Sequence, residues 1–229
     1  LFKDPVFSVT NVVSIFATAS FFGLILLMPL MLQGTRHLSP GMSGLTTFPQ
    51  ALGVMLMSPF SRKLYRTVGP RRMMASGLAV GGLVMLLLLH TSLTSSLWDY
   101  RLILFGRGLC WAFVFSPLQA SAFSQVAMPD TGRASSLFST QRQVASSLGI
   151  AVLISILMTQ INNVKAHLTT LMAQPHHVAS AFYNAYKVPF FWTCMFAFVG
   201  AIAALFVDDH KVLAVFRQRE GATSQRSAE

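Results

Sequence analysis

One stretch of the sequence places a line of small or polar side chains on an otherwise apolar helix. Residues 132–157 read GRASSLFSTQRQVASSLGIAVLISIL, in which residues four positions apart share one helical face. The residues on that face are small or polar throughout: Ser135, Ser139, Gln143, Ser147, Ala151 and Ser155. Such side chains offer hydrogen bonds to a solute, and their small size lets helices approach closely in lipid. We interpret the stripe as lining or flanking a pathway, with a plain packing seam as the alternative; the two roles are compatible.

Two arginines fall inside apolar runs, where a cation is costly unless it faces protein or a water-filled cavity. Arg142 lies beside the stripe, and Arg107 lies about one and a half turns into another run. Arg107 is expected either to extend to the outer surface along its aliphatic stem or to face the interior of a bundle. In the interior its charge would set the potential of a cavity and tune a nearby carboxylate. Gln119 and Gln143 are further candidates for polar contacts in a pathway.

The acidic residues are placed so that none of them is expected near the middle of a membrane. All seven lie at helix ends or outside the apolar runs: Asp4, Asp99, Asp130, Asp208, Asp209, Glu220 and Glu229. Exchange of a proton for a solute usually uses a carboxylate near mid-membrane, so the chain is not expected to complete proton coupling by itself. No nucleophile–base pair or metal-ligand cluster occurs at useful spacing, so we predict no enzyme, no metal site and no cofactor.

The composition indicates what kind of scaffold must position these groups. Of the 229 residues, 53% are hydrophobic and 10% are charged, whereas soluble domains carry about 25% charged residues. Apolar runs long enough to cross a bilayer recur along the chain, at residues 6–32, 41–60, 73–89, 101–125, 132–157 and 189–207. The sequence therefore predicts an all-α polytopic membrane protein with six transmembrane helices. The net charge of +10 does not indicate nucleic acid, because in such proteins the position of the charges matters more than their sum.

The second run contains Gly44, Pro49, Gly53 and Pro59. These residues are poor helix formers in water, but a bilayer tolerates them where neighbouring helices satisfy the freed backbone groups. Interrupted helices are typical of moving or ligand-binding segments in membranes, and a simple packing kink is the alternative. Pro49 and Gly53 are therefore gating or packing candidates.

A basic loop is predicted after the second run. The segment SRKLYRTVGPRR, residues 61–72, holds five Lys or Arg and no acid, which is typical of cytoplasmic loops. Six spans put both termini on that side, and most of the 17 Lys and Arg residues then lie in cytoplasmic segments. We expect a multi-pass protein of the cell (inner) membrane with both termini cytoplasmic. It would consist of a bundle over residues 1–210 and a basic tail over residues 211–229.

Three motifs occur together over about residues 1–210. They are the proline-containing second run followed by Gly69-Pro70-Arg71-Arg72, then Arg107-Gly108 with Pro117 downstream, and GRAS at 132–135 followed by RQVASSLGIA at 142–151. With the six spans, they resemble one half of a major facilitator superfamily transporter. The resemblance is closer to the C-terminal half of the fourteen-span drug:proton antiporters of the EmrB/QacA type.

The resemblance implies a major-facilitator-type half-bundle and a missing N-terminal half that holds the acidic residues. The complete protein would export small amphipathic or drug-like molecules in exchange for protons, while its halves rock about a shared cavity. Its expected partners are membrane lipids, substrate, protons and the missing half, with no nucleic acid. The alternatives are a non-transport membrane scaffold and a nonfunctional gene fragment.

Two further expectations concern helix contacts and gating. Arg71 and Arg72 would hold a cytoplasmic gate by binding carbonyl groups at helix C-termini. Gly149 is a packing candidate within the third motif. This sequence has Ala145-Ser146 where the resembled family has paired glycines, so the helix contact there is expected to be looser.

Overall fold

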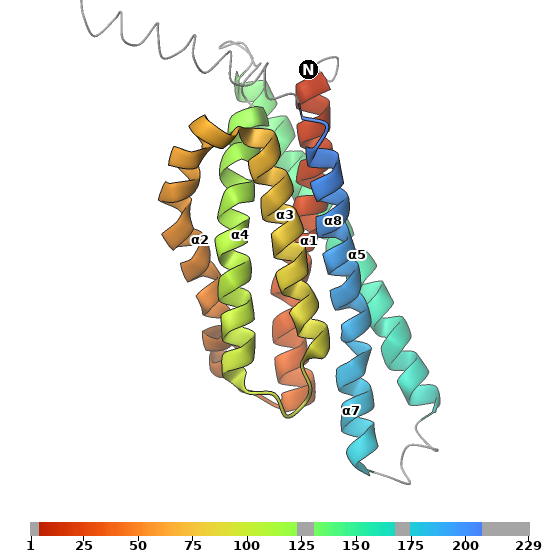
Figure 1. Cartoon of the computed structure of the whole chain (residues 1–229). Coiled ribbons are helices and arrows are strands. Elements are labelled where there is room, and N and C mark those ends of the chain that lie inside the picture. Colours follow the sequence, from red (N-terminus) through yellow and green to blue (C-terminus); the bar gives the residue numbers. More distant parts are fainter. Residues whose placement is uncertain (1–4, 123–130, 168–174, 208–229) are drawn as a thin grey trace, which may run out of the picture.

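The computed structural model describes residues 5–122, 131–167 and 175–207, and within them every regular element is a helix (Figure 1). The helices are α1 (Pro5–Arg36), α2 (Pro40–Val68), α3 (Pro70–His90), α4 (Leu97–Ala122), α5 (Thr131–Ala166), α7 (Pro175–Ala185) and α8 (Lys187–Ala204). Five segments are long and apolar enough to cross a membrane: Ser8–Arg36, Pro70–His90, Leu97–Ala122, Thr131–Ala166 and Val178–Ala204. The prediction of an all-α polytopic membrane protein is confirmed.

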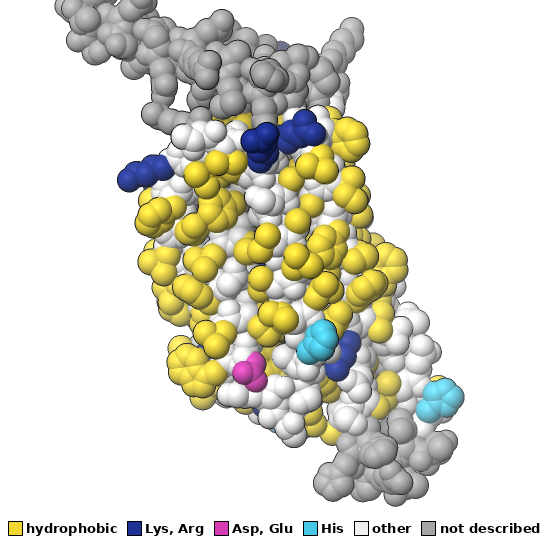
Figure 2. Space-filling view, viewed as in Figure 1, with side chains coloured by type: hydrophobic (Ala, Val, Ile, Leu, Met, Phe, Trp, Pro, Cys, Tyr) yellow, Lys and Arg dark blue, Asp and Glu magenta, His cyan; other side chains and the backbone are white. Residues whose placement is uncertain are grey.

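The second predicted span, within α2, is the exception among the long helices. With 29 residues α2 is longer than a bilayer requires, and it runs along α4 in Figure 1. It is not among the five segments that are apolar enough to cross a membrane. Figure 2 shows hydrophobic side chains over the flank of the bundle and basic side chains toward its two ends.

Helices α1 and α4 occupy the centre of the bundle. Neighbouring helices pack in the order α2, α4, α3, α8, α1, α5, and α1 also contacts α4. Figure 1 accordingly shows α2 on one side and α5 on the other, with the remaining helices between them. Helix α4 thus packs between α2 and α3, and α1 packs between α8 and α5.

Glycines let α4 approach its neighbours closely. Gly108 meets the main chain of Gln50, and a Cβ added at Gly53 would lie 2.9 Å from the amide nitrogen of Leu109. On the other side of α4, a Cβ added at Gly77 would lie 2.9 Å from the carbonyl oxygen of Cys110. Gly81, one turn further along α3, also faces α4, so this pair of small residues lets the two helices pack closely.

The start and end of α2 follow from local sequence. The Ser39 hydroxyl accepts a hydrogen bond from the amide of Met42 at 3.3 Å, and Pro40 occupies the first turn, where a missing N–H costs no helical hydrogen bond. At the other end Gly69 adopts φ 84°, and α3 begins at Pro70. The predicted basic loop at 61–72 is therefore wrong. Lys and Arg are good helix formers, and the basic segment is helical on both sides of Gly69.

Two boundaries at the opposite end of the bundle also differ from the prediction. Helix α5 continues beyond residue 157 to Ala166, so its polar last turns stay helical. The last membrane segment begins at Val178 within α7, so Pro189, in the first turn of α8, lies inside the segment rather than at its start. Residues 168–174 of the predicted outer loop lie outside the described part of the chain.

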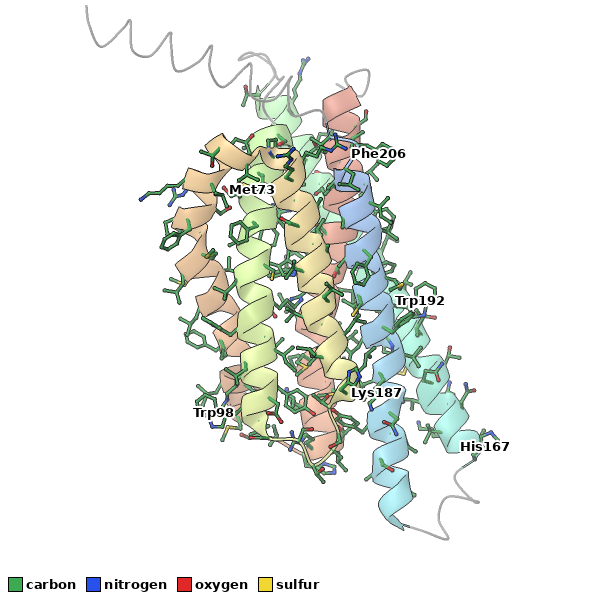
Figure 3. The ribbon with its side chains drawn as sticks, viewed as in Figure 1. Met73, Trp98, His167, Lys187, Trp192 and Phe206 are labelled. Atoms are coloured by element: carbon green, nitrogen blue, oxygen red, sulfur yellow. The ribbon has the colours of Figure 1, made fainter. Side chains whose placement is uncertain are left out.

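A cluster of hydroxyl groups joins α3, α4 and α7 at this end. The hydroxyl oxygens of Tyr100 and Tyr183 are 2.6 Å apart, and that of Thr91 is 2.7 Å from Tyr183. Tyr100 also donates to the carbonyl of Ser92 at 3.1 Å. Tyr100 is fully buried, and its hydroxyl is satisfied inside the protein. Trp98 does point outward, as does Trp192 (Figure 3).

Several predictions fall on residues outside the described ranges. These are the placement of Asp4 and Asp130 at helix ends or outside the apolar runs, the boundary at residue 210 and the basic tail 211–229.

Candidate functional site between helices α1, α4 and α5

Arg107 lies at the centre of the bundle with no solvent exposure. Its Nη2 donates to the carbonyl of Ser20 on α1 at 3.1 Å, and its Nε lies 3.1 Å from the sulfur of Met85 on α3. Its Nη1 has no hydrogen-bond partner within the described residues. Of the two orientations expected from the sequence, the side chain adopts the one that faces the bundle interior.

No carboxylate accompanies this buried guanidinium in the part of the chain that the structure describes. The one acid within those ranges is Asp99, in the first turn of α4, where it is exposed. A buried cation is costly unless it is paired or solvated by polar groups. Arg107 has one carbonyl, one thioether and aromatic faces, so one of its donors remains free for an acceptor.

Four aromatic side chains form a cluster beside Arg107. The ring of Phe21 lies 4.9 Å from Trp111 and 4.9 Å from Phe115, centroid to centroid, and Phe22 lies 5.4 Å from Phe21. The Arg107 guanidinium carbon is 5.3 Å from the Phe21 ring and 5.1 Å from the Trp111 ring. Cation–π contacts at this range stabilise a desolvated charge. Sequence reasoning missed this cluster, since nothing in the chain order pairs Phe21 with Trp111.

Arg142 reaches the same cluster from α5. Its guanidinium carbon lies 6.0 Å from the Phe115 ring and 5.9 Å from the Phe138 ring. It also lines a pocket of about 220 Å³ with Phe22, Ser139, Gln143 and Ser146. The structure thus brings Arg107 and Arg142 to two sides of one aromatic cluster. We call the set Arg107, Phe21, Phe22, Trp111, Phe115 and Arg142 the arginine–aromatic cluster.

The polar stripe of α5 lies at the surface. Every residue from Ser135 to Ser155 at four-residue spacing is exposed, including Gln143 and Ser147. The buried side of α5 is a different face, which packs on α1: Ala134, Phe138, Ala145, Ser146, Gly149, Leu153 and Leu157. Within this chain the stripe is therefore not a packing seam.

The close contact of α5 is made by Gly149. Its Cα packs against the side chain of Ala19 on α1, with no space for a Cβ, and Leu153 packs equally closely on Gly23. Ala145 and Ser146 are buried one turn earlier. Gly149, near the end of the motif at residues 142–151, is thus the glycine that lets α5 pack closely on α1.

The remaining candidates are distributed along the bundle. Gln119 is exposed on α4, four residues beyond Phe115. Pro49 lies inside α2, one turn before the buried Gly53. Arg71 and Arg72 are exposed in the first turn of α3, so the structure does not bring them near the arginine–aromatic cluster.

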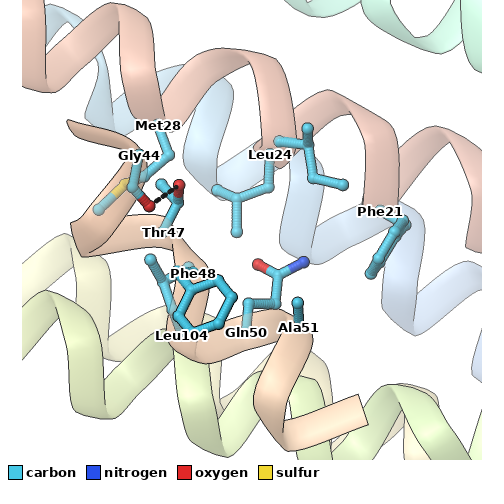
Figure 4. A pocket seen from close by; sticks show the side chains of 10 residues that line it. Phe21, Leu24, Met28, Gly44, Thr47, Phe48, Gln50, Ala51 and Leu104 are labelled. Carbon is cyan, nitrogen blue, oxygen red and sulfur yellow. Dashed lines mark hydrogen bonds between the residues drawn. The ribbon is translucent and has the colours of Figure 1, made fainter. Parts of the chain in front are cut away.

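Sequence reasoning missed Gln50, which follows Pro49 on α2. Its side chain lines a pocket of about 350 Å³ that α1 and α4 complete (Figure 4). A lone amide in an apolar run was the available signal, because intramembrane polar residues are usually functional.

The fold and the buried arginine define a polytopic α-helical membrane protein. Residues 1–150 match the family model described as Major Facilitator Superfamily, and the chain belongs to that superfamily of transporters. Such proteins are generally not enzymes.

The chain is similar to several bacterial resistance proteins. It is 29% identical over 179 residues to the multidrug resistance protein Stp of Mycobacterium tuberculosis, covering 76% of this chain and 33% of Stp. It is 23% identical over 216 residues to the lincomycin resistance protein LmrB of Listeria monocytogenes, covering 92% of this chain and 44% of LmrB. The chain therefore spans less than half the length of these curated relatives.

Proposed function

We propose that this chain forms the C-terminal half of a proton-coupled secondary transporter that exports small amphipathic or drug-like molecules by alternating access. The observation that carries the proposal is the arrangement of Arg107, which is fully buried, contacts Phe21 and Trp111, and has no hydrogen-bond partner for Nη1 among the described residues. A transmembrane cation held in this way is functional by default, because its burial stabilises nothing by itself.

Proton coupling assigns a partner to the free donor of Arg107. A carboxylate contributed by helices outside the described part of this chain would accept from Nη1 when it is ionised. A nearby guanidinium lowers the pKa of such a carboxylate, so breaking the contact favours protonation. Movement of one half against the other would make and break this contact, which links proton binding to the exposed state of the cavity.

The length relation supports the assignment to one half. The chain spans 33% of Stp and 44% of LmrB, and a major facilitator half contains six helices. The exposed stripe of α5 gives a second support. Exposed Ser147 and Gln143 are poorly suited to lipid, and we assign them to the cavity between the halves. Gln119 and Arg142 belong to the same surface in this proposal.

The basic residues suggest the orientation. Arg62 and Lys63 lie near the end of α2, and Arg71 and Arg72 begin α3, so four exposed cations gather at that end. We assign that end to the cytoplasm of a cell membrane and both termini of the segment to the same side. Arg71 and Arg72 would close a cytoplasmic gate there, with Pro49 and Gly53 allowing α2 to move.

The test uses Arg107→Met in the full-length transporter, expressed in a drug-sensitive host. Met preserves much of the side-chain volume and removes the charge, so we expect efflux driven by a proton gradient to be lost while membrane insertion persists. Arg101→Met is the matched control, because Arg101 lies over Trp98 at the outer end and should leave efflux unchanged.

Three results would overturn the proposal. The first is wild-type efflux by Arg107→Met, and the second is wild-type efflux that persists after an ionophore dissipates the gradient. The third applies if Arg107→Met fails to insert into the membrane. Arg107→Lys then serves as the test, because it keeps a cation at the site. If Arg107→Lys inserts and its efflux and pH dependence are unaltered, the guanidinium has no role in the mechanism. A scaffold or a nonfunctional fragment would show no gradient-dependent efflux at all.

A further inference from the structure

The pocket between α1, α2 and α4 has the size and lining of a small-molecule site. Its volume of about 350 Å³ falls in the range of about 300–1,000 Å³ that is usual for ligand pockets. Its surface is almost entirely hydrocarbon, and none of its lining side chains is charged. Figure 4 places Phe48 on one side of Gln50 and Phe21 on the other.

Gln50 supplies the polar group of this pocket. Its side chain is 7% exposed, and its amide points from α2 toward Leu24 of α1 without a hydrogen bond to the residues around it (Figure 4). The amide opens onto the pocket, so a ligand with a matching polar group can form a hydrogen bond to it in place of water. The amide provides both a donor and an acceptor, so it pairs with a carbonyl, a hydroxyl or an N–H group.

The second polar side chain in the pocket is already occupied. The Thr47 hydroxyl donates to the carbonyl of Gly44 at 3.0 Å within α2. An ionised ligand would lose its hydration without meeting an opposite charge on the pocket wall, and this disfavours ions. An acyl chain would fill the volume but leave the Gln50 amide unpaired.

We propose that this pocket is a binding subsite for uncharged amphipathic molecules with a flat apolar body and one hydrogen-bonding group. The body lies against Phe21 and Phe48, and the polar group pairs with the Gln50 amide. This inference deepens the proposed export function and rests on it for its role in transport. The Phe21 ring also lies 5.3 Å from the guanidinium carbon of Arg107, so a molecule bound against Phe21 contacts the arginine–aromatic cluster directly.

Binding is measured on the purified full-length transporter in nanodiscs, with empty nanodiscs subtracted. The probe is N-phenyl-1-naphthylamine, which is uncharged and has one N–H donor. Its comparison is 8-anilinonaphthalene-1-sulfonate, which has the same ring systems with an added sulfonate. We expect saturable binding of the uncharged probe in this pocket and none of the sulfonate.

Gly44→Met fills the pocket from α2, because a Cβ at Gly44 meets no atom within 4 Å. Gly41→Met is the matched control, since Gly41 is equally open, lies one turn away on the same helix and does not line the pocket. We expect Gly44→Met to weaken binding of the uncharged probe by at least about tenfold and Gly41→Met to leave it unchanged. Gln50→Leu removes the hydrogen bond at similar volume and should weaken binding by about three- to tenfold.

Each contrary result overturns a defined part of the proposal. Unchanged binding in Gly44→Met removes the pocket as the site. Equal or tighter binding in Gln50→Leu indicates a purely apolar occupant, such as a lipid acyl chain. Sulfonate binding that Gly44→Met abolishes would show that the site accepts anions. Efflux assays separate the two proposals. If the expected binding pattern is found without gradient-dependent efflux, only the export function is refuted. If gradient-dependent efflux is found without the expected binding pattern, only the pocket is refuted.

Discussion

Gly108 of α4 packs directly against the main-chain carbonyl of Gln50 on α2, so the two helices meet backbone to backbone. The residue before Gly108 is Arg107, at the heart of the arginine–aromatic cluster, and the side chain of Gln50 faces the neighbouring pocket. One contact therefore positions the buried cation and the pocket amide relative to each other.

Replacing Gly108 with Ala should separate α2 from α4. The added methyl group overlaps the Gln50 carbonyl, and neither backbone can yield locally, so we expect a loss of about 1–3 kcal/mol in the free energy of unfolding. Gly106→Ala is the control, because a Cβ there lies at an ordinary 3.6 Å from Val84. Thermal unfolding in detergent compares the two, and equal midpoints would contradict the close-contact account.

Tyr183→Phe should loosen the outer end of the bundle. The substitution removes the hydroxyl that bonds to both Tyr100 and Thr91, and each of these residues keeps a carbonyl acceptor. We therefore expect the free energy of unfolding to fall by about 1 kcal/mol. Tyr186→Phe is the comparison, because its hydroxyl makes one longer bond of 3.3 Å to the Leu30 carbonyl. Hydrogen exchange of α7 amides measures the effect, and faster exchange in Tyr186→Phe than in Tyr183→Phe would reverse the assignment.

Ser147→Leu distinguishes a cavity surface from a packing seam. Ser147 is exposed, so the free energy of unfolding of the bundle should change by no more than about 0.5 kcal/mol. Efflux by the full-length transporter should fall strongly, because a bulky side chain would occupy the cavity surface. Val152→Leu, also exposed on α5, serves as the control and should leave efflux intact. Destabilisation without any change in efflux of the folded fraction would favour the seam.

The all-α polytopic class was predictable because apolar runs of about 20 residues have few other solutions, although the run within α2 is not among the five segments that qualify as spans in the described residues. Local rules account for the start of α2 at the Ser39 cap once the structure is known. They failed where polar residues continue a helix. Asn162, Asn163 and Lys165 resemble a loop by composition, yet they extend α5, because a helix that leaves the bilayer need not end there.

The site was only partly accessible from the sequence, since helical spacing gives faces but not their neighbours. The polar stripe through Ser147 was recognised as one face, but its exposure depends on where α1 packs, which is decided by Gly149 and Ala19. The inward orientation of Arg107 depends on the Ser20 carbonyl, a group on another helix 87 residues away in the chain. Such relations require the assembled bundle.

The junction at Gly69 limits how the bundle can rearrange. A single residue in a left-handed conformation joins α2 to α3, and its amide is bonded back to Tyr65 at 3.3 Å. The connection is one residue long, so a change in the tilt of α2 must either rotate the backbone of Gly69 or move α3 as well. Gly69 alone absorbs any change of angle between α2 and α3, so the movements of these two helices are coupled through one residue.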